Sequence, residues 1–443
     1  MPEGEIGQPA ETAPGSAPGS TPGSTPGSTP GSTPGGERWL YRMVALCLLF
    51  SMAGRGLTET FTVFLIPLVE EFQAERASVT AVFSVQMLCG ALAGPAVGYL
   101  FDRFGVFRLY LGGLLLQVCG LALASFAASL WQLFIGIGLC VGIASAALGA
   151  VAHGALLARW FDGRPYARNM SIIFAGFGLG TLLMVPLSQW LVQNFGWRHA
   201  YLALAGVLFV VLTPAMRMVN WRKAQAGSAQ WQAKRSAGEQ DIETGRHGFT
   251  LRQAIRVPAF WGLAAVFFFT SNGMFSVMVQ AVAYLMENGF PPLQAASIYG
   301  LIGMLTPIGV IGFSWLDNRI GRYASALASY LLSIAGLLAL FALQWWPSPL
   351  LLWSFVLCVG FSFGARAPMV TSTSARIFQG RQLGLILGCI TLGAGSGVFV
   401  GSLTGALLHD ITNGYAAVFG YSALSLLIGA LPFLTLRALR DAA

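Results

Sequence analysis

The chain is dominated by apolar runs that are each long enough to cross a lipid bilayer as a helix. About 20 apolar residues span a hydrocarbon core roughly 30 Å thick. Twelve runs meet this length: approximately 40–68, 79–100, 109–129, 131–158, 169–192, 199–218, 259–286, 293–315, 323–344, 350–375, 383–408 and 415–436. Because the runs are continuously apolar and do not alternate, they predict helices rather than barrel strands. With 55% hydrophobic and 9% charged residues, the chain is expected to be an all-α integral membrane protein.

Basic residues are distributed unevenly among the segments that connect these runs. If the N-terminus is cytoplasmic, the cytoplasmic connections hold most of the arginines, and the outer connections hold only Arg76 and Arg198. This positive-inside pattern predicts a multi-pass protein of the cell (inner) membrane with both termini in the cytoplasm. The net charge of +8 follows from this topology, so no nucleic-acid partner is expected.

Two further features of composition carry little chemistry. Residues 1–36 form a Pro/Gly/Ser/Thr-rich tract, which predicts a disordered cytoplasmic tail and is not a signal peptide. The six cysteines all lie inside apolar runs and have no metal-ligand spacing. They are expected to be buried hydrophobes, and neither a metal site nor a disulfide framework is expected.

An internal repeat divides the chain into two halves. Residues 158–164 are echoed by 375–381, and residues 102–105 are echoed by 317–321, with offsets near 216 positions. This spacing predicts two six-helix bundles with a binding site between them. The expected divisions are an N-terminal bundle at 37–218, a cytoplasmic central loop at 219–257 and a C-terminal bundle at 258–443.

The turn after the second run has a specific motif. Residues 98–108 resemble the loop 2-3 signature of the major facilitator superfamily in residue type, spacing and position. The resemblance implies twelve transmembrane helices in two pseudo-symmetric bundles. It also implies a latch at their cytoplasmic ends, made of Asp102, Arg103, Gly105 and Arg108 with Asp317 and Arg319 in the second half.

Other segments are similar to one branch of that superfamily. Residues 160–180, 186–191 and 196–198 resemble the helix 4-5 and 5-6 pattern of the monocarboxylate transporters and oxalate/formate antiporters, and residues 384–410 resemble their helix 11. One departure concerns helix 8, because residues 291–315 lack the charged residues that members of this branch carry there. Substrate and coupling ion therefore cannot be inherited from the branch.

Two arginines lie near the middle of apolar runs, where an unpaired charge costs about 2.5 to 3.5 kcal/mol. The first, Arg55, has Glu59 four residues later on the same helix face, so the two side chains can neutralise each other. The pair could simply lock the first helix. Alternatively, Arg55 is a substrate ligand for an anion and Glu59 is a proton-coupling residue.

The second arginine, Arg366, has no carboxylate within four residues on its own helix. Pro368 cannot donate to the carbonyl of Gly364, which predicts a kink beside the arginine. A guanidinium at such a kink suits bidentate binding of a substrate carboxylate. The alternative is a salt bridge to Glu59 or to another helix.

A few more polar residues and two glycine ladders lie inside the runs. His153 could carry protons or hydrogen-bond a neighbouring helix. In the seventh run, Asn272, Gln280 and Tyr284 share roughly one face and could bind substrate or join helices. The ladders repeat every four residues and predict close helix packing: Gly90, Gly94 and Gly98 in the second run, and Gly397, Gly401 and Gly405 in the eleventh.

These observations predict a secondary active transporter of small organic anions, mono- or dicarboxylates, that works by alternating access. No ATP-binding loop is present, so proton symport or anion exchange would drive it. The expected partners are the anion, a proton or counter-anion and the bilayer; no cofactor and no catalytic residue is expected. The alternatives are efflux of drugs or siderophores, and a non-transporting membrane carboxylate receptor. The oligomeric state is not set by the sequence, and a monomer is compatible with it.

Overall fold

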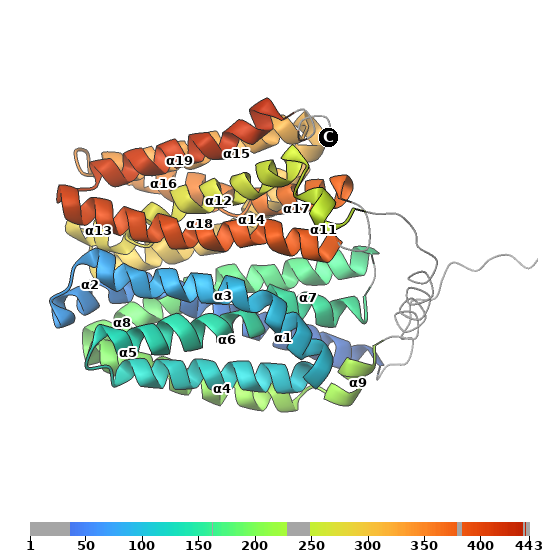
Figure 1. The fold of residues 1–443 in the computed structure, drawn as a ribbon. Helices are drawn as coiled ribbons and strands as arrows, with labels where there is room; N and C mark the ends of the chain where they lie inside the picture. Colours follow the sequence, from blue (N-terminus) through green and yellow to red (C-terminus); the bar gives the residue numbers. More distant parts are fainter. Residues whose placement is uncertain (1–35, 162, 228–248, 379–382, 437–438, 440–443) are drawn as a thin grey trace, which may run out of the picture.

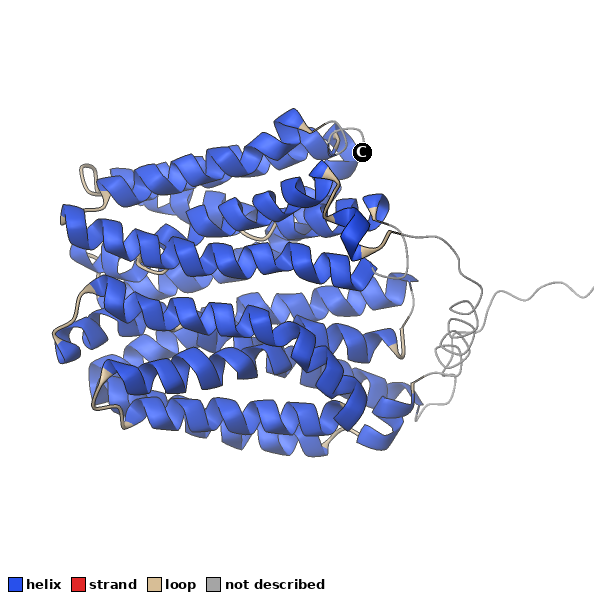
Figure 2. Ribbon diagram, viewed as in Figure 1, coloured by secondary structure: helices blue, strands red, loops and turns tan. Residues whose placement is uncertain are grey.

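The described part of the chain is helical, with loops between the helices and no strand (Figure 2). The computed structural model describes residues 36–161, 163–227, 249–378, 383–436 and 439. The predicted tail, apart from its last residue, and the middle of the predicted central loop lie outside these ranges. The all-helical fold class is confirmed.

The long helices of the two halves follow the predicted apolar runs closely, and two short helices, Trp221–Ala226 and Leu251–Ala254, lie in the predicted central loop. The first half contains α1 (Gly36–Glu59), α2 (Phe61–Phe72), α3 (Arg76–Phe104), α4 (Val106–Ser125), α5 (Leu130–Leu133), the π-helix η1 (Phe134–Val141), α6 (Gly142–Ala147), α7 (Ala150–Ala158), α8 (Gly163–Arg217) and α9 (Trp221–Ala226). The second contains α11 (Leu251–Ala254), α12 (Pro258–Met278), α13 (Ala281–Glu287), α14 (Pro292–Ile320), α15 (Arg322–Ala342), α16 (Pro349–Ser362), α17 (Arg366–Ile377), α18 (Leu383–Thr412) and α19 (Ala416–Thr435).

The number of membrane-spanning segments agrees with the prediction. Among the described residues, 11 helical stretches are long and apolar enough to cross a membrane. One of them, Arg168–Arg217, contains two spans, because Gly196 breaks it with φ 76° and ψ 163°. The part of the chain that the structure describes therefore contains twelve such segments.

Glycine forms the same tight turn in both halves. Gly105 joins α3 to α4 with φ 80° and ψ 160°, and Gly321 joins α14 to α15 with φ 83° and ψ 157°. A side chain at these backbone angles would be strained, so glycine is required. The two turns are 216 positions apart, and the sequence repeat is thus visible in the backbone.

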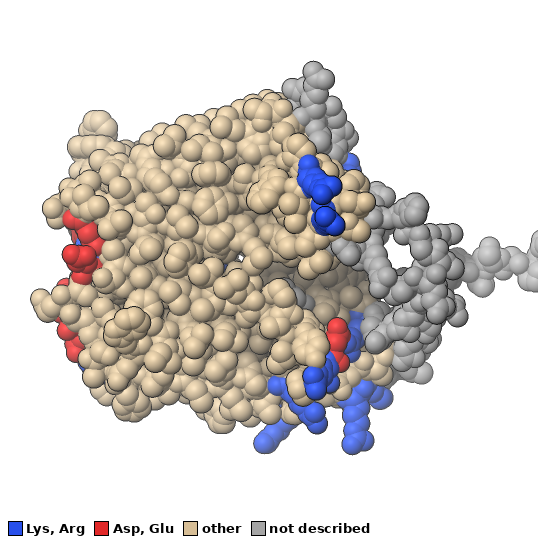
Figure 3. Space-filling view, in the orientation of Figure 1, with Lys and Arg blue, Asp and Glu red and all other residues tan. Residues whose placement is uncertain are grey.

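The two halves lie side by side (Figure 1). Their most extensive contacts are between α3 and α18 and between α8 and α14, and α2 also contacts α13. Lys and Arg gather at the end of the molecule that holds the α3–α4 and α14–α15 turns, which we call the basic end (Figure 3). We call the opposite end, with the α2–α3, α13–α14 and α18–α19 connections, the acidic end.

The glycine ladder of α18 allows close packing against α12, as predicted. A Cβ added at Gly397, Gly401 or Gly405 would lie 2.2 Å from a backbone oxygen of α12. The ladder of α3 behaves differently: Gly90 lies against α6, whereas Gly94 and Gly98 face open space. The packing prediction was wrong for Gly94 and Gly98, because no neighbouring helix lies within contact distance of these two positions of α3.

Candidate functional site

Among the described residues, four transmembrane segments are broken near their middle. The breaks lie at Thr60 between α1 and α2, at 148–149 between α6 and α7, at 279–280 between α12 and α13, and at 363–365 between α16 and α17. Corresponding breaks recur in the two halves: Thr60 and Gln280 are 220 positions apart, and Leu148 and Gly364 are 216 apart. Interrupted helices at repeat-related positions are typical of transporter binding sites, because irregular backbone is tolerated where it lines a site.

The first break places Glu59 at the end of α1. Three threonine hydroxyls around it donate to carbonyls three or four residues earlier: Thr58 to Gly54 at 2.9 Å, Thr60 to Leu57 at 2.7 Å and Thr62 to Glu59 at 3.1 Å. Such back-bonding competes with the helical ladder and bends helices. The local sequence therefore interrupts the helix directly after the carboxylate.

Glu59 is the centre of a buried polar cluster that joins the two halves. Arg55 Nη2 lies 2.5 Å from Glu59 Oε1, and the hydroxyl of Tyr299 in α14 donates to Glu59 Oε2 at 2.6 Å. The side chain of Arg55 is 32% exposed and that of Glu59 only 6%. We call these three residues the triad. The predicted pairing of Arg55 with Glu59 is confirmed, and Tyr299 is a partner that the sequence analysis missed.

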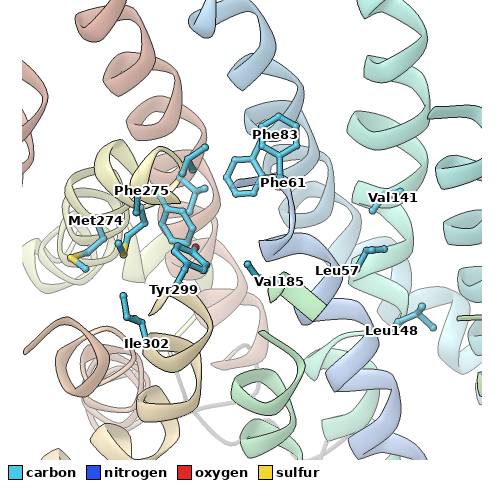
Figure 4. Packing of buried hydrophobic residues seen from close by; sticks show 14 of the residues in the cluster. Leu57, Phe61, Phe83, Val141, Leu148, Val185, Met274, Phe275, Tyr299 and Ile302 are labelled. Carbon is cyan, nitrogen blue, oxygen red and sulfur yellow. The ribbon is translucent and has the colours of Figure 1, made fainter. Parts of the chain in front are cut away.

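Aromatic rings join the halves beside the triad. Phe83 of α3 stacks on Phe275 of α12 with ring centroids 6.2 Å apart, and Phe61 and Phe363 extend the row on either side. Figure 4 shows Phe61 and Phe83 together on the first half, with Phe275 and Tyr299 on the second. Phe61 begins α2, which runs from the break after Glu59 to the acidic end, so the rings lie between the halves on the acidic side of the triad.

Arg366 lies inside the second half and contacts α15. Its Nε donates to Ser329 Oγ at 3.0 Å, and its Nη2 donates to the Ser329 carbonyl at 2.9 Å and to Ser333 Oγ. The guanidinium also stacks on the ring of Tyr330, 4.2 Å from its centroid. None of the described carboxylates forms an ion pair with Arg366, so the alternative of a bridge to Glu59 does not hold in this conformation.

The expected kink at Arg366 is present as a full break between α16 and α17. Pro368 is the third residue of α17, where a missing N–H costs nothing because first-turn donors have no partner within the helix. Nη1 is buried and has no hydrogen-bond partner among the described residues. This atom is the part of Arg366 that remains available to a ligand.

His153 lies in the core of the first half. The hydroxyl of Tyr110 in α4 lies 2.6 Å from His153 Nδ1 and 3.8 Å from Cys47 Sγ of α1. All three residues are fully buried. His153 thus joins α7 to a neighbouring helix, as one of its two predicted roles requires. None of its described hydrogen bonds is to a triad residue.

The polar residues of the seventh span have different surroundings. Tyr284 donates to the Phe341 carbonyl at 3.0 Å and joins α13 to α15. Asn272 packs against Gly401 of α18. Gln280 lies at the α12–α13 break, and neither atom of its buried amide has a partner among the described residues. Of the three, Gln280 best keeps the capacity to bind a ligand.

The latch residues lie at the basic end, and their described contacts stay within one half. Asp102 pairs with Arg159 at 3.3 Å, and Asp317 pairs with Arg322 at 3.4 Å. Arg103 donates to Tyr99, and Arg319 lies over the ring of Trp315. Arg108 is exposed on α4.

At the acidic end, a second set of polar contacts crosses between the halves. Arg76 of α3 pairs with Glu287 of α13 and donates to the Tyr415 hydroxyl at 2.7 Å. The N–H of Ala77 donates to Asp410 Oδ2 at 2.7 Å. We call these residues the clasp. From the sequence, only Arg76 stood out, as one of the two arginines in the outer connections. Its partners could not be identified, because they lie more than 200 positions away along the chain.

Comparisons with known proteins agree with this architecture. A family model described as Major Facilitator Superfamily matches residues 44–378. Monocarboxylate transporter 13 of Bos taurus is 27% identical over 382 residues, covering 86% of this chain and 85% of that protein. Monocarboxylate transporter 12 of Homo sapiens is 26% identical over 419 residues, covering 88% and 80%. A mutant of the peptide transporter POT, solved in complex with sulfate, has a TM-score of 0.70 at 14% identity and covers 90% of this chain and 95% of its own, which shows the fold alone.

Proposed function

This chain belongs to the major facilitator superfamily and is a multi-pass membrane transporter, and we propose that it carries small organic anions together with protons. The proposed substrates are mono- or dicarboxylates. The observation that carries the proposal is the triad: a half-buried arginine inside a membrane-spanning helix, whose described partner is itself a carboxylate.

The geometry of Arg55 supports carboxylate recognition. A guanidinium has five donors, and only Nη2 has a described partner, so the others are available to a second acceptor. Gly56 lets α1 approach α8 closely, since a Cβ there would lie 2.6 Å from the Gly180 carbonyl. Arg55 therefore sits on a firmly packed helix, and its exposed third can receive a substrate carboxylate.

Glu59 supplies the coupling to protons. While Glu59 is ionised it neutralises Arg55, and a second carboxylate at the same guanidinium would be repelled by it. Protonation removes this competition, so proton binding and anion binding favour each other. A hydrogen bond to a neutral acid is also weaker than one to a carboxylate, so protonation loosens the Tyr299 contact between the halves.

The two ends of the molecule then have distinct roles. We place the protein in the cell (inner) membrane with its basic end on the cytoplasmic side, because basic residues accumulate on that side of membrane proteins. The clasp and the aromatic row hold the halves together at the acidic end, so this conformation is closed to the outside. Rocking of the halves would open the clasp and expose Arg55 to the outside, as alternating access requires.

The names of the relatives support the substrate class. The curated proteins similar over most of this chain include monocarboxylate transporters 12 and 13. Their identities of 26 to 27% do not specify an individual substrate, so the proposal is made for the carboxylate class.

Uptake into vesicles that contain the purified full chain tests the proposal. Radiolabelled lactate, pyruvate, oxalate and succinate would be offered with the outside more acidic than the inside, and at equal pH. We expect uptake of at least one carboxylate, stimulated by the acidic outside and lost in Arg55→Gln. Uptake that requires an anion inside the vesicles and does not depend on pH would indicate anion exchange and contradict proton symport. Carboxylate binding without uptake would instead make the protein a receptor.

A further inference from the structure

A groove of about 570 Å³ lies where α3 meets α12 and α18. Its described lining has no charged residue and comprises Leu88, Ala91, Leu92, Ile255, Phe260, Trp261, Ala264, Ala265, Phe268, Cys389, Leu392, Gly393 and Ser396. None of these residues belongs to the triad or the clasp. A volume of this size is within the range of roughly 300 to 1,000 Å³ that ligand sites occupy.

The groove faces the bilayer. Leu92 and Trp261 on its rim are 59% and 60% exposed, as expected for a leucine that faces acyl chains and a tryptophan at the membrane interface. The wall from Phe260 to Phe268 rises about 12 Å at 1.5 Å per residue, within one leaflet of a core about 30 Å thick. In the space-filling view, the surface between α18 and α3 is hollowed toward the basic end (Figure 3).

The basic end of the groove carries positive charge at headgroup depth. Arg252 and Arg256 are exposed and flank Ile255, which lines the groove. Neither arginine forms an ion pair with a described residue, whereas Asp102 and Asp317 at this end are paired with other arginines. Trp261 Nε1 donates to the Ile255 carbonyl at 2.8 Å, and a tryptophan at this position is typical of the membrane interface.

The segment that holds the arginines is locally ordered. Thr250 and Gln253 form a capping box at the start of α11, in which the Gln253 N–H donates to Thr250 Oγ1 at 3.3 Å and Gln253 Oε1 accepts from the Thr250 N–H at 2.9 Å. Arg252 is exposed on this capped helix, three residues before Ile255 of the groove lining. A phosphate there would meet two cations without first ordering a loop.

We propose that this groove binds an anionic phospholipid from the leaflet at the basic end. One acyl chain lies along α18 between α3 and α12, and Arg252 and Arg256 hold the phosphate. An apolar slot that ends at a pair of cations matches both parts of such a lipid. Because α3 belongs to one half and the other walls to the second, the bound lipid contacts both halves and stabilises this conformation.

Native mass spectrometry of the full chain in detergent tests the proposal, with dioleoylphosphatidylglycerol as the probe. We expect one saturable site, with weaker binding of dioleoylphosphatidylcholine. Each surface arginine contributes roughly fivefold to affinity for an anionic headgroup, so Arg252→Gln with Arg256→Gln should weaken binding on the order of 25-fold. Ala265→Phe should abolish the site by filling the groove; Ser396→Leu serves if that variant fails to fold.

Matched controls separate the groove from general surface effects. Arg217→Gln with Arg222→Gln removes two exposed charges at the same end, and Ala335→Phe adds a ring on the exposed face of α15. Both should bind the probe as the unmodified chain does. Equal loss in both double variants, or unchanged binding by both groove-filling variants, would overturn the proposal. Saturable binding of inorganic phosphate alone at the two arginines would also contradict the proposal, because the arginines would then form a site for free phosphate and not for a lipid.

Discussion

Replacing Glu59 by glutamine imitates the protonated carboxyl at nearly constant shape. In the structure Glu59 Oε1 lies 2.5 Å from Arg55 Nη2, so the negative charge of the ionised side chain repels a substrate carboxylate that approaches the free donors of the same guanidinium. We therefore expect Glu59→Gln to bind carboxylates more tightly than the unmodified chain at alkaline pH, and with no dependence on pH.

The size of the effect follows from the exposure of the pair. A hydrogen bond to a charged group contributes about 1.5 to 3 kcal/mol. Solvent screens the pair, because the Arg55 side chain is 32% exposed, and the lower value applies. At about 1.5 kcal/mol, removal of the competing carboxylate should tighten anion binding roughly tenfold.

Calorimetric titration of the purified protein with lactate or succinate over a series of pH values measures this change. The unmodified chain should bind better as the pH falls, and Glu59→Gln should bind equally throughout. Glu71→Gln is the matched control, since Glu71 forms an exposed ion pair with Arg198 at 2.7 Å within the first half. If Glu59→Gln kept the pH dependence of the unmodified chain, another group would be the proton carrier and the coupling argument would fail.

Three further outcomes are expected. Arg366→Lys should lower the unfolding temperature more than Arg55→Lys, since it loses the planar contacts to Ser329 and the stacking on Tyr330, worth about 3 kcal/mol together; equal unfolding temperatures would contradict this reading. Arg76→Gln should lengthen the distance between spin labels placed on either side of the clasp, while Arg198→Gln, whose ion pair lies within one half, should leave it unchanged. Gly401→Ala should destabilise the protein by about 1 to 3 kcal/mol through overpacking, because its Cβ would lie 2.2 Å from the Asn272 carbonyl; Gly420→Ala, which faces open space, is the control.

The fold could be predicted from the sequence because its determinants are local. Span length follows from the thickness of a bilayer, and the repeat of the Asp102 and Asp317 turns indicates two related halves. The pairing of Arg55 with Glu59 was predictable for the same reason, since four residues on one helix bring the side chains together.

Contacts between distant elements could not be predicted in this way. Tyr299 reaches Glu59 across 240 positions, and a tyrosine in an apolar run gives no sign of its partner. Arg366 has no partner on its own helix, and the serines that bind it lie on α15. The helix breaks were anticipated only beside Pro368, because the break at Thr60 arises from side-chain hydrogen bonds rather than from proline.

Simultaneous recording of proton and anion entry tests the central claim most directly. Vesicles with the full chain and an internal pH-sensitive dye would be given a radiolabelled carboxylate at equal pH on both sides. The account predicts that the interior acidifies as the anion enters, and that Glu59→Gln vesicles take up or exchange the anion without acidification. Anion entry without acidification in the unmodified chain, or acidification that persists in Glu59→Gln, would contradict it.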